Sequence, residues 1–320
     1  MDSATIRKSP ALHGLWKALC VAAALAGAAY LVQAFRTDRL ELWLFDFEIF
    51  WRAGRRILVG TSPYRVKGFI SPLPLAVLFA PLGLLPMHAA YGVFVLGSLG
   101  LLWKAAGRRA GWALLSFPVL FTLFVGQVDL VLALAAALLG PLALPLLLAK
   151  PQVAFVAAPW LLRHGLQADR RRLAIGIAAA LGMLLLCFWL RPNWIAEWRK
   201  AAPPLDDYAA HDSNLYWLVS GGGDAIRTNL VWILTPIALA VGLWLRERRD
   251  SWAVLHLFTP ITNVYSTAVL AEWIGPLEML LSWAAFVVAG SIHGGAPMFV
   301  IALAILARGW LASKKVPAPQ

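Results

Sequence analysis

The stretch "FDFEIFWRAGRRILVGTSPY" (residues 45–64) places two acids and three arginines directly after the first long apolar segment. Read as a helix over residues 47–58, its charged side chains recur every three or four positions and share one face, and apolar side chains gather on the other. Gly60 and the Pro63-Tyr64 pair then end the helix. The pattern predicts a short amphipathic helix lying in the plane of a membrane interface. The charged face consists of Glu48, Arg52, Arg55 and Arg56.

The composition of the whole chain agrees with a membrane location. Of its 320 residues, 61% are hydrophobic and 14% are charged, whereas soluble domains have about 45–50% apolar and 25% charged residues. The apolar runs are continuous, unlike the alternating strands of a membrane barrel. At ~20 residues per span, we predict an all-α, polytopic integral membrane protein of about 10–11 spans.

The formal net charge of +12 is typical of loops that face anionic lipid. No basic soluble region exists to bind nucleic acid, so we predict none as a partner. Cys20 and Cys187 both lie in apolar segments, which indicates neither a disulfide framework nor a metal cluster. We predict no metal and no cofactor. The basic and then apolar N-terminus also fits a signal peptide, but a run of ~20 residues favours an uncleaved span at 16–35.

Two long polar segments, 36–71 and 191–227, interrupt the apolar ones. Counting each intervening apolar segment as one crossing puts both on the same side of the membrane. The short basic loops at 163–172 and 246–249 then fall on the opposite, cytoplasmic side. The same count places Gln127 and Asp129 on the face away from Asp46, as caps at the start of a span. No long internal repeat is evident.

Asp46 has two interpretations from the residues alone. It precedes the predicted helix, so its carboxylate is suited to cap the first backbone N–H groups. It also lies among aromatic residues at the membrane surface, where a reduced dielectric raises a carboxyl pKa toward that of a general base.

The run from Asp46 to Tyr64 resembles the first external loop of family 87 glycosyltransferases, membrane enzymes of the GT-C fold that use polyprenyl-phosphate mannose. Three further pieces follow in the family's order: "SPLPLAVLFAPLGLLP" (71–86), "GQVDLVLALAAALL" (126–139) and "LAKPQVAFVAAPWLLRHG" (148–165). The resemblance implies a GT-C-like module over residues 1–190, a second external loop at 191–227 and C-terminal spans with a short tail at 228–320.

The resemblance also implies a function. A sugar would pass from a polyprenyl-phosphate donor to a hydroxyl of a glycolipid or glycan acceptor, at the periplasmic face of a bacterial cytoplasmic membrane. The leaving group is already a stable anion, so one carboxylate suffices as base, unlike the paired acids of glycosidases. Inversion at the anomeric carbon follows. Asp46 is the predicted base, with Glu48 as the alternative.

The departing phosphate needs cations. Lys150 is the only charged residue between Asp129 and Arg163, and the span count puts it on the side of Asp46; a lysine that snorkels from a helix end is the alternative. Further predicted phosphate contacts are Arg52, Arg55 and Arg56, which also suit lipid headgroups. The predicted acceptor-binding residues are Tyr64, His211, Asp212 and Asn214, with the aromatic belt and a solvated loop as their alternatives.

The second half departs from the family. "HDSNLYW" (211–217) has the expected pieces in another order, and "TPITNVYSTAVL" (259–270) has Asn263 and Tyr265 where the family shows tryptophan and histidine. Other interpretations therefore stand beside the enzyme: a degenerate GT-C protein without catalysis, a transporter or lipid flippase, or a GT-C enzyme with another sugar or acceptor.

Overall fold

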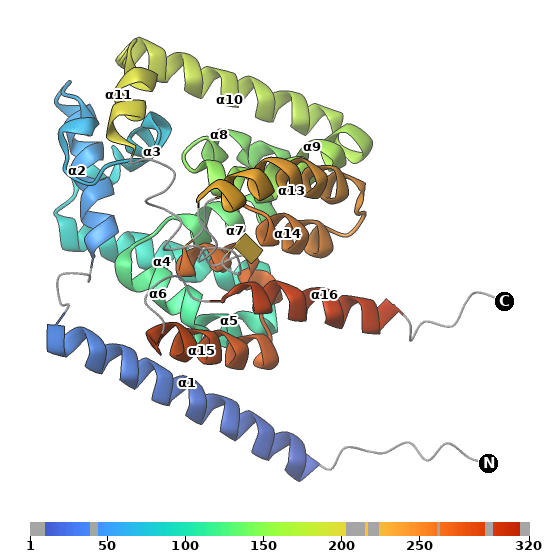
Figure 1. The fold of residues 1–320 in the computed structure, drawn as a ribbon. Helices are drawn as coiled ribbons and strands as arrows, with labels where there is room; N and C mark the ends of the chain where they lie inside the picture. Colours follow the sequence, from blue (N-terminus) through green and yellow to red (C-terminus); the bar gives the residue numbers. More distant parts are fainter. Residues whose placement is uncertain are drawn as a thin grey trace.

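The computed structural model describes residues 10–38, 44–202, 215–216, 224–260, 263–291 and 297–313. The described residues are helical or in turns and contain no strand, so the predicted all-α class is confirmed. Figure 1 shows the helices as one bundle, with α1 along one edge and α10 along the opposite edge.

The α-helices are α1 (Pro10–Asp38), α2 (Phe45–Leu58), α3 (Leu73–Phe79), α4 (Met87–Ala106), α5 (Ala110–Leu114), α6 (Phe117–Val125), α7 (Asp129–Leu139), α8 (Leu144–Leu147), α9 (Pro151–Ala168), α10 (Arg170–Leu190), α11 (Trp194–Ala201), α13 (Asp224–Trp244), α14 (Arg248–Leu257), α15 (Pro276–Ser291) and α16 (Phe299–Ser313). Short 3-10 helices are η2 (Pro63–Arg65), η3 (Leu82–Leu84), η4 (Gly107–Arg109), η5 (Gly140–Ala143) and η7 (Val264–Trp273).

By length and composition alone, three helical stretches of the described residues could cross a membrane: Met87–Leu114, Asp129–Leu147 and Arg170–Leu190. The second of them is interrupted at Gly140. Shorter apolar helices cover Trp16–Ala29, Asn229–Trp244, Pro276–Val287 and Phe299–Ser313. The three long stretches are fewer than the predicted 10–11 spans.

The predicted count treats every apolar segment as one crossing, and several of the segments form helices that are short for one. Several of these segments form helices of only 7 to 11 residues, namely α3, α6 and α7. At 1.5 Å per residue such helices are about 10–17 Å long, about half of a 30 Å hydrocarbon core or less. Proline or glycine interrupts the apolar sequence at the ends of these short helices.

Two consecutive segments make this turn in the same way. α4 and α7 each end at a glycine with positive φ, Gly107 (φ 53°, ψ −122°) and Gly140 (φ 60°, ψ −137°). A 3-10 turn and a short helix follow each glycine, and the next helix carries a proline in its first turn, Pro118 or Pro151. Both pairs are 33 positions apart in the sequence. The two turns therefore share the same order of glycine, 3-10 turn, short helix and proline at the same spacing.

The second of these segments folds back completely. Asp129, at the start of α7, forms an ion pair with Lys150, immediately before α9. A straight helix over Asp129–Leu147 would separate these ends by about 28 Å, far beyond the reach of two side chains. The turn at Gly140 is what brings them together, so α7 and α8 form a hairpin instead of one straight span.

The predicted amphipathic helix is confirmed as α2. Its buried face consists of Phe47, Ile49, Phe50, Ala53 and Gly54. The Phe47 ring packs on Phe79 and Tyr91 at centroid distances of 5.8 and 5.3 Å. These contacts hold α2 against α3 and α4. Figure 1 shows α2 and α11 at the same end of the bundle.

Gly126 joins α6 to α7 and tests how tightly α2 is held. Its φ of +78° is left-handed, and an added Cβ would lie 2.3 Å from the Cβ of Phe47. We expect Gly126→Ala to destabilise the fold by more than the about 1–3 kcal/mol of left-handed strain alone, measured as the melting temperature in detergent. Gly140→Ala, with φ +60° but open space around the Cβ, isolates the strain; Gly182→Ala in α10 has neither problem. Equal melting temperatures for the three variants would contradict this prediction.

Candidate functional site

The start of α2 aims Asp46 inward. The residue before the helix is Leu44, which is buried, adopts a left-handed conformation (φ 64°, ψ 5°) and donates its N–H to the carbonyl of Phe124 in α6 at 3.2 Å. A leucine in this conformation is strained, and such strain is commonly held at functional sites. Asp46 lies in the first turn and no side chain caps the helix, so the N-cap interpretation of Asp46 is wrong.

Asp46 lines a cavity of about 660 Å³, a size typical of sites for small ligands. The cavity lies where α2, the α6–α7 junction, the start of α9, α11 and the segment before η7 meet. Its polar lining residues are Asp46, Ser71, Gln127, Lys150, Gln152, Thr259, Asn263 and Tyr265. Its aromatic lining residues are Phe45, Phe50, Phe155, Trp198 and Tyr265. The structure thus brings Asp46 and Lys150 into one cavity, as the sequence predicts.

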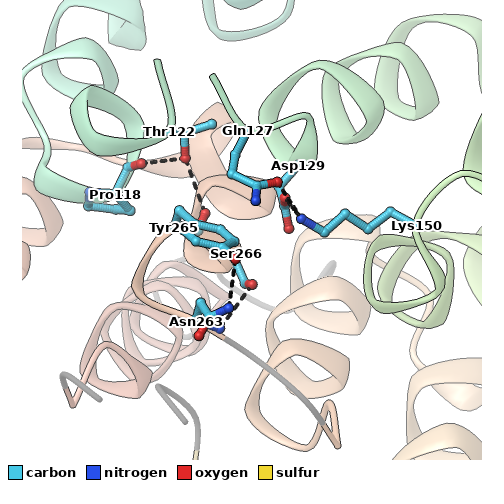
Figure 2. Close-up of polar contacts among 8 residues, drawn as sticks. All are labelled: Pro118, Thr122, Gln127, Asp129, Lys150, Asn263, Tyr265 and Ser266. Carbon is cyan, nitrogen blue, oxygen red and sulfur yellow. Dashed lines mark hydrogen bonds and ion pairs between the residues drawn. The ribbon is translucent and has the colours of Figure 1, made fainter. Parts of the chain in front are cut away.

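Lys150 is held at the cavity by two side chains of the α6–α7 junction (Figure 2). Its Nζ donates to Gln127 Oε1 at 2.6 Å and forms a close ion pair with Asp129 Oδ2. Asp129 is fully buried and Lys150 nearly so. The other carboxylate oxygen of Asp129 has no hydrogen-bond partner among the described residues. The junction therefore fixes the ammonium group in place, and Lys150 does not snorkel to an interface.

The Asp46 carboxyl differs from an exposed aspartate. Burial raises its pKa above the ordinary value, against the lowering effects of the Lys150 charge and of a hydrogen bond with Gln127, and the negative charge of Asp129 raises it further. A carboxyl with a raised pKa is a stronger base once ionised. Asp46 thus has the environment that the general-base interpretation requires.

The segment that departs from the family pattern supplies the opposite wall. The Tyr265 ring centroid lies 5.0 Å from Lys150 Nζ, within cation–π distance. Asn263 Nδ2 donates to the Tyr265 hydroxyl at 2.6 Å, and Thr122 of α6 donates to the Tyr265 carbonyl at 3.3 Å. Figure 2 shows Thr122 and Asn263 on either side of Tyr265, with Gln127 and Asp129 at the Lys150 ammonium. In the sequence, Asn263 and Tyr265 stand out only as departures from the family 87 pattern. The structure shows that both line the cavity.

The span count predicts Gln127 and Asp129 on the face away from Asp46, and this prediction is wrong. Both side chains contact Lys150, and Gln127 also lines the cavity. The count is wrong here because it assigns a full crossing to residues 128–148, which fold back at Gly140. An acid and an amide at the start of an apolar segment were the available sequence signal. Their interpretation as caps fails because neither side chain caps α7.

Helix α2 separates the predicted site residues into two groups. Glu48, Arg52, Arg55 and Arg56 line a second, open groove on the other side of α2 and not the Asp46 cavity. Glu48 forms a close ion pair with Arg52 there. The two hollows share only Phe45, Ile49 and Gly68 among their lining residues. The three arginines are therefore not placed to contact the same phosphate as Lys150, and Glu48 is not placed to replace Asp46.

Of the predicted acceptor residues, the structure describes only Tyr64. Tyr64 packs on Phe69 at a centroid distance of 5.5 Å and lines neither hollow. His211, Asp212 and Asn214 lie outside the described residues. Among the described residues there is no group of three or more histidine, cysteine, aspartate or glutamate side chains able to hold a metal ion.

The two polar segments contact each other beside the cavity. Ser62 donates to Glu197 of α11 in a short hydrogen bond, and Arg191 pairs with the same carboxylate at 2.9 Å. Burial raises the pKa of Glu197, but the hydrogen bonds from Ser62 and Arg191 and the nearby positive charges outweigh it, so the net pKa is lowered. Trp198 also donates to the Ile70 carbonyl at 2.8 Å. These bonds hold α11 over the cavity.

Comparison with known proteins adds no neighbour: no family model matches the chain, and no curated protein or solved structure does.

The Lys150–Asp129 pair gives a prediction about stability. Removing one partner leaves the other charge buried and unpaired, which costs about 3–5 kcal/mol. We expect Asp129→Asn and Lys150→Met each to lower the melting temperature in detergent substantially. The double variant Asp129→Leu/Lys150→Met should recover most of the loss, because no buried charge remains. Additive losses in the double variant would show that the two charges do not depend on each other.

Proposed function

We propose that this chain is a multi-pass membrane glycosyltransferase with a GT-C-like helical bundle. It transfers a sugar, mannose or another hexose or pentose, from a polyprenyl phosphate to a hydroxyl of a glycolipid or glycan. The single observation that supports this best is the presence of a desolvated carboxylate, Asp46, and a fixed ammonium, Lys150, in one cavity of about 660 Å³. The family 87 resemblance covers both residues, Asp46 in its first piece and Lys150 in the piece at 148–165.

The chemistry assigns one role to each group. The Asp46 carboxylate takes the proton of the acceptor hydroxyl as its oxygen attacks the anomeric carbon and the bond to the lipid phosphate breaks. Lys150 lies where positive charge stabilises the departing phosphate. Because that phosphate leaves as an anion, no second carboxyl is needed as acid, in agreement with a cavity that presents one carboxylate among its lining residues. The transfer inverts the anomeric centre.

The cellular setting follows from the same resemblance. We place the chain in a bacterial cytoplasmic membrane with the Asp46 cavity open to the periplasm. The partners are then the donor lipid, the acceptor and the surrounding membrane lipids.

A second candidate, a GT-C-like protein that binds a lipid without catalysis, is favoured by one observation. The Lys150 ammonium already has two close partners, Gln127 and Asp129, so a phosphate would share it with them. One assay separates the two functions: purified protein is incubated with labelled polyprenyl-phosphate sugars and a lipid extract as acceptor. Transfer supports the enzyme. Binding of donor lipid without turnover supports the second candidate. The absence of both transfer and binding points to a transporter.

Asp46→Asn tests the base directly. We expect this nearly isosteric change to reduce transfer by at least 100-fold, since general-base catalysis contributes about 10²–10⁴-fold, with the melting temperature in detergent almost unchanged. Glu48→Gln is the matched control, because it removes a carboxylate from the same helix but on the other groove. Near-normal turnover in Asp46→Asn would overturn the assignment.

The pH dependence follows from the raised pKa of Asp46. The base works only when ionised, so transfer should be constant above that pKa and fall about tenfold per pH unit below it. The fall should begin at a higher pH than an exposed aspartate would give. The same profile in Glu48→Gln, and its loss from the residual rate of Asp46→Asn, would assign the titration to Asp46; a profile unchanged in Asp46→Asn would exclude it.

Lys150→Gln tests the phosphate role. This variant keeps a hydrogen-bond donor but removes the charge, and it leaves Asp129 buried without its cation, so the accompanying Asp129→Asn change is needed to restore charge balance. For the double variant we expect a higher KM for the donor and a slower rate of sugar transfer, both measured with a short-chain donor. Arg171→Gln is the control, because it removes an exposed cation that lines neither hollow. An unchanged donor KM and rate would exclude Lys150 from phosphate binding.

A further inference from the structure

The open groove beyond α2 is a feature that the proposed sugar transfer does not use. It has a volume of about 1110 Å³ and lies between the outer face of α2 and the segment after η2. Five cationic side chains line it, against one carboxylate, Glu48. The cations are Arg52, Arg55, Arg56, Arg65 and Lys67.

Most of this charge is uncompensated. Glu48 pairs with Arg52. Among the described residues no carboxylate forms an ion pair with Arg55, Arg56, Arg65 or Lys67. Four cations gathered around one hollow repel each other, and an anion placed among them relieves that repulsion. The planar guanidinium groups suit the oxygens of a phosphate.

The groove is also apolar at its edge. Phe45 and Val59 line it, and their side chains are 48% and 68% exposed. The Arg55 guanidinium stacks over the Trp51 ring at 5.0 Å. Exposed apolar side chains beside cations are unsuited to a free inorganic anion but match a ligand with a charged head and a hydrocarbon chain.

Helix geometry keeps this groove apart from the Asp46 cavity. Asp46 and Arg55 are nine residues apart, which at 3.6 residues per turn directs their side chains to opposite sides of α2. Phe45, Ile49 and Gly68 form the shared wall between the two hollows. Gly68 has a φ of +85°, and an added Cβ would lie 2.9 Å from Ile49 Cδ1, so Gly68 and Ile49 are closely packed within this wall.

We propose that this groove binds the phosphate of an anionic lipid, with the lipid chain lying over Phe45 and Val59. The site does not depend on sugar transfer and would exist equally in a non-catalytic protein. The lipid is either an anionic phospholipid of the bilayer or a polyprenyl phosphate, which share the same head chemistry.

The test uses the full chain, purified in a neutral detergent, and measures lipid retention by native mass spectrometry. The probes are phosphatidylglycerol, phosphatidylcholine, polyprenyl phosphate and inorganic phosphate. The variant is Arg55→Gln/Arg56→Gln/Lys67→Gln, and the control is Lys104→Gln/Arg108→Gln/Arg171→Gln, which removes three exposed cations elsewhere. Each basic residue near an anionic lipid contributes about fivefold to binding, so the loss of three should weaken retention roughly 100-fold.

We expect wild type to retain phosphatidylglycerol or polyprenyl phosphate, the groove variant to lose it and the control to keep it. Preferential retention of polyprenyl phosphate identifies a substrate-type lipid; retention of both to a similar degree identifies a general site for anionic lipid. Equal loss in the control, equal retention of phosphatidylcholine, or equally tight inorganic phosphate would overturn the proposal. Loss of the same lipid in Lys150→Gln/Asp129→Asn, with the groove variant unaffected, would place the phosphate in the Asp46 cavity instead.

Discussion

The ion pair between Lys150 and Asp129 is the constraint on which the site depends. A charge in a region of low dielectric needs a partner, because an isolated buried ion costs several kcal/mol. The chain meets this need by turning at Gly140, which returns Lys150 to the start of α7. The same junction presents Gln127 to the ammonium and Gly126 to α2, so one electrostatic requirement positions the cavity floor and the helix that carries Asp46.

Helix α2 gives two electrostatic environments from one amphipathic pattern. Its inward side places Asp46 in a cavity lined by aromatic rings, where burial raises the carboxyl pKa. Its outward side carries the arginines, which face an open groove together with Arg65 and Lys67. The strained Leu44 and the close approach of Gly126 to Phe47 fix the rotation of the helix. A rotation of one residue, about 100°, would move Asp46 out of its cavity.

Sequence patterns predicted the elements of this site better than their connections. Periodicity predicted helix α2 and its two faces, and the position of Lys150 alone in an apolar run indicated a site residue. Both signals are local in the sequence. The path of residues 128–148 was not predictable, since a straight span and a hairpin have the same composition and differ only in the backbone angles at Gly140. That one turn decides the side on which Gln127 and Asp129 lie. Asn263 and Tyr265 reach the cavity through contacts more than 100 residues away in sequence, which no local pattern encodes.

The charges around the cavity oppose the entry of an anionic donor in the proposed reaction. Asp46, Asp129 and Lys150 together carry one excess negative charge when both acids are ionised. A donor phosphate entering beside them adds more, which further raises the pKa of Asp46 and opposes binding. In the proposed transfer Lys150 offsets this repulsion, because it is the only cation among the described residues that line the cavity.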